Sequence, residues 1–295
     1  MITYRELTDK SHRLETDIAH MLRIDFTGTR YKVYQGIVED ITVAWENQTT
    51  AEYIKRHPFN ETVFSMQQLQ ELVSILGFVK KIFACSSPKV QTHIRKKVKV
   101  MLGGPIFTHE ENFNSSEARN TQFELRVATK MSESGYKAEL LDHPDVLVDT
   151  KPRVYGIECK RVNSSKAIMS NIARAISQLD EYSGSYDGRI VAVDISRLLD
   201  LGKKYFSSPT PERANEAILD VLHDTINKIY TQMDSLSTLS INKRVVALML
   251  TYSGLYILHD NSMGWVQEIG FLVFNKEHPV EAELCIKDFK SLKHP

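Results

Sequence analysis

The sequence has few cysteines, no net charge and no long apolar run, and each of these absences excludes a class of protein. Its three cysteines, Cys85, Cys159 and Cys285, are far apart and odd in number. They predict neither a disulfide framework nor a cysteine metal site, and they favour a reducing compartment. Lysine plus arginine and aspartate plus glutamate both total 37. A nucleic-acid-binding protein of this charge needs its basic residues clustered, because nothing attracts it to polyanions overall.

Signals for membranes and for export are also missing. No apolar run reaches the length of a membrane span, and the N-terminus lacks a signal-peptide pattern. We therefore expect a cytoplasmic protein that does not engage a membrane. There are no repeats and no low-complexity tract. With 295 residues, of which 42% are hydrophobic, the chain predicts one large globular domain or two small ones.

The first part of the chain predicts a helical region. Apolar residues recur at helical spacing from Tyr4 to Met21 and from Leu69 to Leu76. Gly103-Gly104-Pro105 is the clearest break in the chain, and the polar residues 108–120 suit a linker. We therefore expect a helical N-terminal region over residues 1–105 and a second domain over residues 106–295.

A basic segment lies just before this break. It contains Lys89, Arg95, Lys96, Lys97 and Lys99. The last four are candidates for contact with nucleic-acid phosphates. The alternative is that the segment is a solvated helix face.

Residues 143–161 predict two short strands joined by a tight turn. Residues 146–148 and 154–157 are apolar runs rich in β-branched side chains. Pro152 fixes its own φ angle and cannot donate to a strand ladder, so residues 150–153 suit the turn.

This turn sets the register of the hairpin. With four residues in the loop, Asp149 pairs with Val154, and counting back places Asp145 opposite Glu158. Directly opposed residues share a face, with Cβ atoms roughly 5 Å apart. Lys160 lies on the same face, because side chains alternate along a strand. A slip of one residue would put Glu158 on the face opposite to Asp145.

Two other aspartates, Asp142 and Asp149, compete with Asp145 for a role at this site. Asp149 lies four residues further along the strand, about 13 Å away at the usual rise per residue. Asp142 falls before the strand starts. We therefore favour Asp145.

The residues Asp145, Glu158 and Lys160 suit metal-assisted hydrolysis. Two adjacent carboxylates repel each other when both are ionised and unpaired, and a hard cation such as Mg²⁺ or Mn²⁺ removes this repulsion because it prefers oxygen ligands. It would lower the pKa of a bound water and steady charge on a scissile phosphate, while Lys160 could orient the attacking water. The alternative is that the two carboxylates are ordinary strand-end residues and Lys160 is their solvated partner.

Regular elements flank the hairpin on both sides. Residues 123–134 have helical spacing with Glu124 near their start, Gly135 is a natural helix stop, and a strand follows at residues 136–141. Downstream, Asn163-Ser164-Ser165 offers an N-cap for a helix. Gln178 and Tyr182 are four residues apart on it and share a face. Its predicted buried stripe is Ile168, Ile172, Ala175, Ile176 and Leu179.

Further elements complete an α/β pattern. The short apolar run at residues 190–193 predicts a strand that is buried on both faces. Residues 211–233 predict a long helix, and residues 245–250 and 270–274 predict strands that extend the sheet or cover one of its faces.

This order of elements and motifs, over residues 120–196, resembles the PD-(D/E)xK nuclease superfamily. Phe123-Glu124, Gly135-Tyr136, Pro144-Asp145 and residues 158–161 look like its Mrr-like branch, while Gln178 and Tyr182 look like the extra motif of RecB-like exonucleases. The chain lacks the histidine that RecB-like enzymes often carry in the first helix. The resemblance implies a restriction-endonuclease-like fold, in which helices flank a mixed central sheet.

The resemblance also implies roles for individual residues. Asp145 and Glu158 would be metal ligands with the Cys159 carbonyl as a third, and Lys160 would be the catalytic lysine. Glu124 would be an outer ligand, reached through water. Gln178 and Tyr182 would act beside the site, and Arg161 is a further candidate for contact with nucleic acid.

The expected function is Mg²⁺- or Mn²⁺-dependent hydrolysis of phosphodiester bonds in DNA, by an endonuclease rather than an exonuclease. A role in defence against foreign DNA would fit the resemblance. The alternative is a nucleic-acid-binding or assembly protein that keeps the fold without turnover. RNA as the substrate, a homodimer and an activating partner protein stay open.

Overall fold

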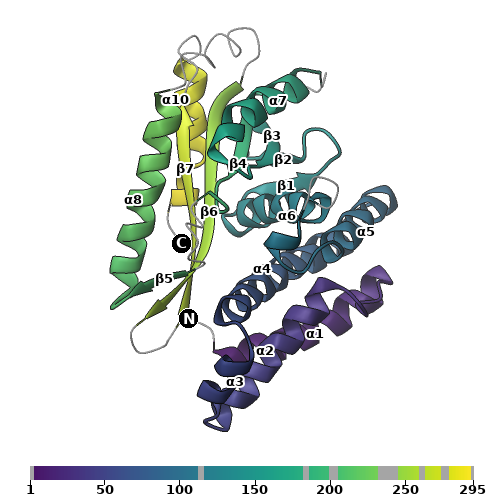
Figure 1. Ribbon diagram of the computed structural model, residues 1–295. Helices are drawn as coiled ribbons and strands as arrows, with labels where there is room; N and C mark the ends of the chain where they lie inside the picture. The colour runs from purple at the N-terminus through teal and green to yellow at the C-terminus, as the bar shows by residue number, and fades with distance from the viewer. Residues whose placement is uncertain are drawn as a thin grey trace. The chain divides into compact units, whose positions relative to one another are not determined.

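A computed structural model describes residues 3–111, 116–181, 186–198, 205–231, 245–258, 263–273 and 279–293 (Figure 1). The chain divides into two compact units, Met1–Gln122 with Met263–Trp265, and Phe123–Ser262 with Val266–Pro295. The N-terminal region is helical and the remainder is α/β, so the predicted fold class is confirmed at this level. None of the helices that the structure describes is both long enough and apolar enough to cross a membrane.

The first unit is built from helices. They are α1 (Tyr4–Leu22), α2 (Arg30–Glu46), α3 (Thr50–Arg56), α4 (Phe59–Ala84) and α5 (Pro88–Leu102), followed by the short helix η1 (Thr108–Glu110). Thr3 and Glu6 form a reciprocal capping box that satisfies the first free amides of α1. Leu7, Leu14 and Ile18 of α1 are buried at helical spacing, as predicted.

Two buried arginines join the start of α6 (Glu117–Glu133) to the rest of this unit. Arg30 donates to the carbonyl of Met101 and to Gln122 Oε1, in both cases at 2.7 Å. Arg119 donates to Gln68 Oε1 at 2.9 Å and to the carbonyl of Ile106 at 2.7 Å. Buried charges need such hydrogen bonds. Residues 117–120 therefore begin a helix instead of belonging to the predicted linker.

The second unit is built on one mixed sheet. Its strands are β1 (Lys137–Leu140), β2 (Val146–Asp149), β3 (Val154–Arg161), β4 (Gly188–Asp194), β5 (Tyr205–Ser208), β6 (Val245–Leu258) and β7 (Met263–Val273). The strand order is β1-β2-β3-β4-β6-β5, and β7 also pairs with β6. The β1–β2 and β2–β3 pairs are antiparallel, while β3–β4, β4–β6 and β5–β6 are parallel.

Helix α7 (Ile168–Glu181) packs on β3 and β4 (Figure 1). Its predicted buried stripe is confirmed, because Ile168, Ile172, Ala175, Ile176 and Leu179 join one core cluster with Val191, Val193 and Leu250 of the sheet. The predicted N-cap is not formed. Ser164 precedes the short helix η3 (Ser165–Ala167) without a side-chain capping hydrogen bond, and its carbonyl accepts from Ala167 at 3.0 Å instead.

The C-terminal half adds α8 (Pro211–Tyr230), α10 (Pro279–Asp288) and η4 (Lys290–Lys293). Thr210 caps α8, and Pro211 stands in its first turn. The predicted strand at residues 245–250 is confirmed, and it continues to Leu258. The strand predicted at residues 270–274 begins earlier, at Met263, and residue 274 lies outside the described residues.

We predict that Gly188→Ala destabilises the protein. A Cβ atom at Gly188 would lie 2.8 Å from Cε1 of Tyr155, and the Tyr155 ring is tethered because its hydroxyl donates to Asp288 at 2.7 Å. Such overpacking costs about 1–3 kcal/mol. Urea denaturation measures the effect. The control, Gly36→Ala, has open space in helix α2 and should be neutral or stabilising by up to about 1 kcal/mol. Equal stability of the Gly188→Ala variant and the wild type would contradict the packing.

Candidate functional site

The register of the β2–β3 hairpin is the one predicted from the turn. Asp149 pairs with Val154 and Val146 pairs with Ile157, so one further step places Asp145 opposite Glu158. The turn is closed by a hydrogen bond from the Thr150 amide to the carbonyl of Arg153, at 2.9 Å. Asp149 accepts from the amide of Lys151 at 2.7 Å. The competing aspartate is therefore engaged at the turn, at the far end of the hairpin.

Asp145 is held against β3 by the backbone. Its side chain is buried, and Oδ2 accepts from the Cys159 amide at 2.7 Å. The preceding Pro144 lies over Gly156, where an added Cβ atom would stand 3.0 Å from the Pro144 Cγ. Glycine at position 156 therefore lets the Pro-Asp segment rest directly on β3.

Glu158 and Lys160 form a close ion pair on one side of β3. Lys160 Nζ lies 2.8 Å from Glu158 Oε1. The Glu158 residue is only 2% exposed, and its second oxygen, Oε2, finds no hydrogen-bond partner in the part of the chain that the structure describes. Because an unsatisfied buried carboxylate oxygen is costly, this atom indicates a place for a positively charged ligand.

Glu124 of α6 joins the same electrostatic environment. The pKa of the Cys159 thiol is raised well above its ordinary value, first by burial and then by the negative charges of Asp145, Glu124 and Glu158, while Lys160 alone opposes them. The structure thus brings together four of the predicted residues. The charges of these three carboxylates and of one ammonium group all act on the buried Cys159 thiol.

The donor atoms predicted for the metal site are oxygens, the type that a hard divalent cation prefers. No group of three or more His, Cys, Asp or Glu side chains in the described ranges is arranged to hold a metal ion. The predicted set is different, because it consists of two carboxylates and the backbone carbonyl of Cys159. Oxygen donors of this kind suit Mg²⁺ or Mn²⁺, and Glu158 Oε2, which has no hydrogen-bond partner among the described residues, is consistent with such an ion.

Gln178 lies on α7, the helix that packs on β3. The residue is half-buried, and its Oε1 is buried with no hydrogen-bond partner among the described residues. Its amide group is therefore not solvated on an open surface. Tyr182, which sequence analysis pairs with Gln178, lies outside the described residues.

The structure gives Arg161 an internal partner. Its Nε lies 3.7 Å from Asp194 Oδ2, and both side chains are about nine-tenths buried. Arg126 of α6 approaches the same oxygen at 2.8 Å. Sequence analysis missed Arg126 and Asp194. The available signal was a lone aspartate that ends the apolar strand at residues 190–193.

The basic segment forms the middle of α5 in the first unit. Arg95 is part of the fold, because its Nε donates to the Leu22 carbonyl at 2.7 Å and its guanidinium lies over the Phe83 ring. Lys96 and Lys99 are exposed and Lys97 is half-buried. Both interpretations of the segment therefore stay open for Lys96 and Lys99.

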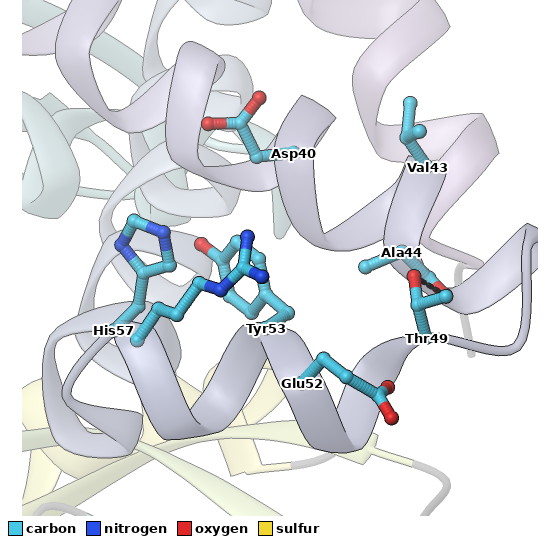
Figure 2. Close-up of a pocket in the computed structure, with 8 residues that line it drawn as sticks. Asp40, Val43, Ala44, Thr49, Glu52, Tyr53 and His57 are labelled. Carbon is cyan, nitrogen blue, oxygen red and sulfur yellow. Dashed lines mark hydrogen bonds between the residues drawn. The ribbon is translucent and has the colours of Figure 1, made fainter.

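A separate cavity of about 420 Å³ lies between α2 and α3 in the first unit (Figure 2). Its lining is mixed: Asp40 and Glu52 are acidic, whereas Arg56 is basic. The rings of Tyr53 and His57 are stacked, with their centroids 4.4 Å apart. None of the residues predicted for catalysis lines this cavity.

Asp194 should make stability depend on pH. Burial alone would raise its pKa, but Arg126, Arg161 and hydrogen bonds from Ser196 outweigh burial and hold the pKa below its ordinary value. A lowered folded-state pKa contributes stability that is present above the unfolded-state value of about 3.9 and is lost as the pH falls through the folded-state value.

We therefore expect Asp194→Asn to cost about 3–5 kcal/mol at pH 7, because it removes the carboxylate that two buried arginines approach. The difference from the wild type should begin to shrink below about pH 3.9, where the unfolded chain takes up a proton at Asp194, and should be lost as the pH falls through the lower folded-state pKa. Urea denaturation at pH 7 and at acidic pH measures both values. A difference that does not change with pH would contradict the ion-pair assignment.

Comparisons with known proteins identify no relative. No family model matches the chain, and neither the curated proteins nor the solved structures gave a match.

Proposed function

We propose that this protein is a metal-dependent nuclease that hydrolyses phosphodiester bonds, with DNA as its substrate. The observation that carries the proposal is the cluster at one end of the β2–β3 hairpin. Asp145 is buried and accepts from the amide of Cys159, the residue after Glu158, while Glu158 pairs with Lys160 at 2.8 Å and its Oε2 is buried without a hydrogen-bond partner among the described residues.

The order of elements supports a restriction-endonuclease-like core for this proposal. Helix α6, which carries Glu124, precedes the antiparallel strands β1, β2 and β3, and α7 then crosses to the parallel strand β4. This is the order on which the sequence resemblance depends. The hairpin, the helix with Gln178 and the buried strand follow one another in this order, which supports the proposal.

Asp145, Glu158 and the Cys159 carbonyl would hold Mg²⁺ or Mn²⁺, with Glu124 as an outer ligand. When bound, the cation lowers the pKa of a coordinated water and offsets negative charge on the scissile phosphate. The chain's own contribution is position: the Cys159 amide fixes the Asp145 carboxylate, and Glu158 fixes the Lys160 ammonium. Lys160 can donate a hydrogen bond to the attacking water or to the phosphate oxygen on which charge develops. Gln178 offers a second donor from α7.

One observation favours the alternative, a nucleic-acid-binding protein without turnover. Asp145 Oδ2 already accepts a hydrogen bond from the backbone, as a purely structural carboxylate would. Against this, a structural role does not account for Glu158 and Lys160 buried together beside Asp145. A variant series separates the two functions.

We predict that Asp145→Asn, Glu158→Gln and Lys160→Met each lower DNA cleavage by at least about 100-fold, the scale of losing one group that stabilises the transition state. The assay uses linear, circular and single-stranded DNA and RNA, with Mg²⁺, Mn²⁺ or EDTA. Lys137→Met is the matched control, because Lys137 pairs with Glu139 at 2.7 Å on exposed β1. Full activity of Asp145→Asn would contradict the site, and full activity in EDTA would contradict the metal.

We predict that Lys96→Ala and Lys99→Ala weaken nucleic-acid binding and flatten its salt dependence, if α5 contacts phosphates. On duplex DNA, the log–log slope should fall by roughly 0.9 for each phosphate that the variant no longer neutralises. Lys80→Ala is the control, since Lys80 is a half-exposed lysine of α4 that pairs with Asp17 at 2.6 Å. An unchanged slope in both variants would establish α5 as a solvated face. Arg95→Ala is unsuitable for this test, because it removes a hydrogen bond that holds the fold together.

A further inference from the structure

Asp194 is the last residue of β4 and lies beside the last residue of the parallel strand β3. In the register of the sheet it stands between Arg161 of β3 and Thr251 of β6. It is buried at the carboxyl end of β4, and the backbone of β3 at this point follows directly from Lys160. The carboxylate therefore lies one strand away from the proposed site.

Four groups hold the Asp194 carboxylate. Arg126 approaches Oδ2 at 2.8 Å and Arg161 approaches it at 3.7 Å. Ser196 donates to Oδ1 both from its amide, at 2.9 Å, and from its hydroxyl. Ser196 Oγ in turn accepts a hydrogen bond from the amide of Ser253. The hydroxyl of Ser253 accepts a hydrogen bond from Arg126 at 2.7 Å. The network is buried and joins α6, β3, β4 and β6.

The two arginines reach Asp194 from the two elements that carry site residues. Arg126 is two residues after Glu124 on α6, and its guanidinium also lies 4.9 Å from the Phe123 ring centroid. Because a helix is rigid, fixing Arg126 fixes the rotation of α6 and therefore the direction of Glu124. Arg161 follows Lys160 on β3 and points to the opposite face of the strand. Fixing Arg161 therefore fixes the backbone that carries Lys160.

We infer that Asp194 is a positioning residue for the proposed active site, with Arg126 holding the Glu124 helix and Arg161 holding the Lys160 strand. This inference rests on the proposed function. Asp194 itself touches neither metal nor substrate; it sets the relation between an outer metal ligand and the catalytic lysine. Misplacement by about 1 Å can cost 100-fold in rate, so a fixed relation between the two elements matters for catalysis.

Substitution of Arg126 and substitution of Arg161 should affect different quantities, and this difference tests the inference. Arg126→Met frees α6, so it should weaken Mn²⁺ affinity about tenfold, the low end for losing an outer-shell partner. Arg161→Met frees the end of β3, so it should lower kcat about tenfold at saturating Mn²⁺ while leaving Mn²⁺ affinity within about twofold. Mn²⁺ binding is measured by electron paramagnetic resonance, and kcat by DNA cleavage.

Arg153→Met is the matched control. It removes an arginine ion pair with Asp288, at 3.1 Å, at the opposite end of the same hairpin. It should leave Mn²⁺ affinity and kcat unchanged even where it lowers the melting temperature. All variants are measured at a temperature at which circular dichroism shows them folded, and Arg126→Lys and Arg161→Lys, which keep the charge, should recover part of each loss.

Each outcome decides a claim. The split between Mn²⁺ affinity and kcat supports the positioning role. Equal changes from both arginine variants and from Arg153→Met would overturn it and leave a structural network, while the nuclease proposal would stand on wild-type cleavage. Wild-type protein that binds Mn²⁺ without cleaving nucleic acid would overturn the nuclease proposal. A loss of Mn²⁺ affinity in Arg126→Met would then still support a positioning role for Arg126 at the metal site. Absence of both binding and cleavage would overturn the two together.

Discussion

The antiparallel pairing of β2 with β3 is the constraint on which the proposed site depends. Side chains alternate along a strand, so Asp145 and Glu158 share a face only in the observed register. Three features fix it: the closed turn at residues 150–153, the contact of Pro144 with Gly156, and the hydrogen bond from the Cys159 amide to Asp145. Without this register the two carboxylates would point to opposite sides of the sheet, and the chemistry proposed for them would be lost.

Charge is the second constraint on the site. Glu158 is buried and pairs with Lys160, and the negative charges of Asp145 and Glu124 act on the neighbouring Cys159 thiol. A buried carboxylate oxygen without a hydrogen-bond partner opposes folding, so Glu158 Oε2, which has none among the described residues, is expected where a cation or a substrate completes the site. The Asp194 network shows the opposite case. There two arginines and hydrogen bonds from Ser196 surround one carboxylate, so its charge is balanced by the chain itself.

Much of the second unit could be predicted from local sequence. β-Branched runs around Pro152 fixed the hairpin and its register, and the helical spacing of Ile172, Ala175 and Leu179 predicted which side of α7 is buried. These signals are local, because they depend on periodicity and on turn chemistry.

What the sequence could not predict depends on contacts between distant residues. Residues 117–120 look like a polar linker, yet they begin α6 because Arg119 is buried against Gln68 and the carbonyl of Ile106. The pairing of Arg126 with Asp194 joins residues far apart in the chain. From the sequence, Arg161 was a candidate for contact with nucleic acid because it follows Lys160. In the structure its side chain is largely buried and lies beside Asp194. No period or spacing encodes such partners.

The central claim is that Asp145, Glu158 and the Cys159 carbonyl form one cation site. Anomalous diffraction from crystals of the protein grown with Mn²⁺ tests this claim directly. The account predicts a single strong peak within coordination distance of Glu158 Oε2 and an Asp145 oxygen, and its loss in crystals of Glu158→Gln. A Mn²⁺ peak elsewhere in the protein, with none between these two carboxylates, would contradict the proposed cation site.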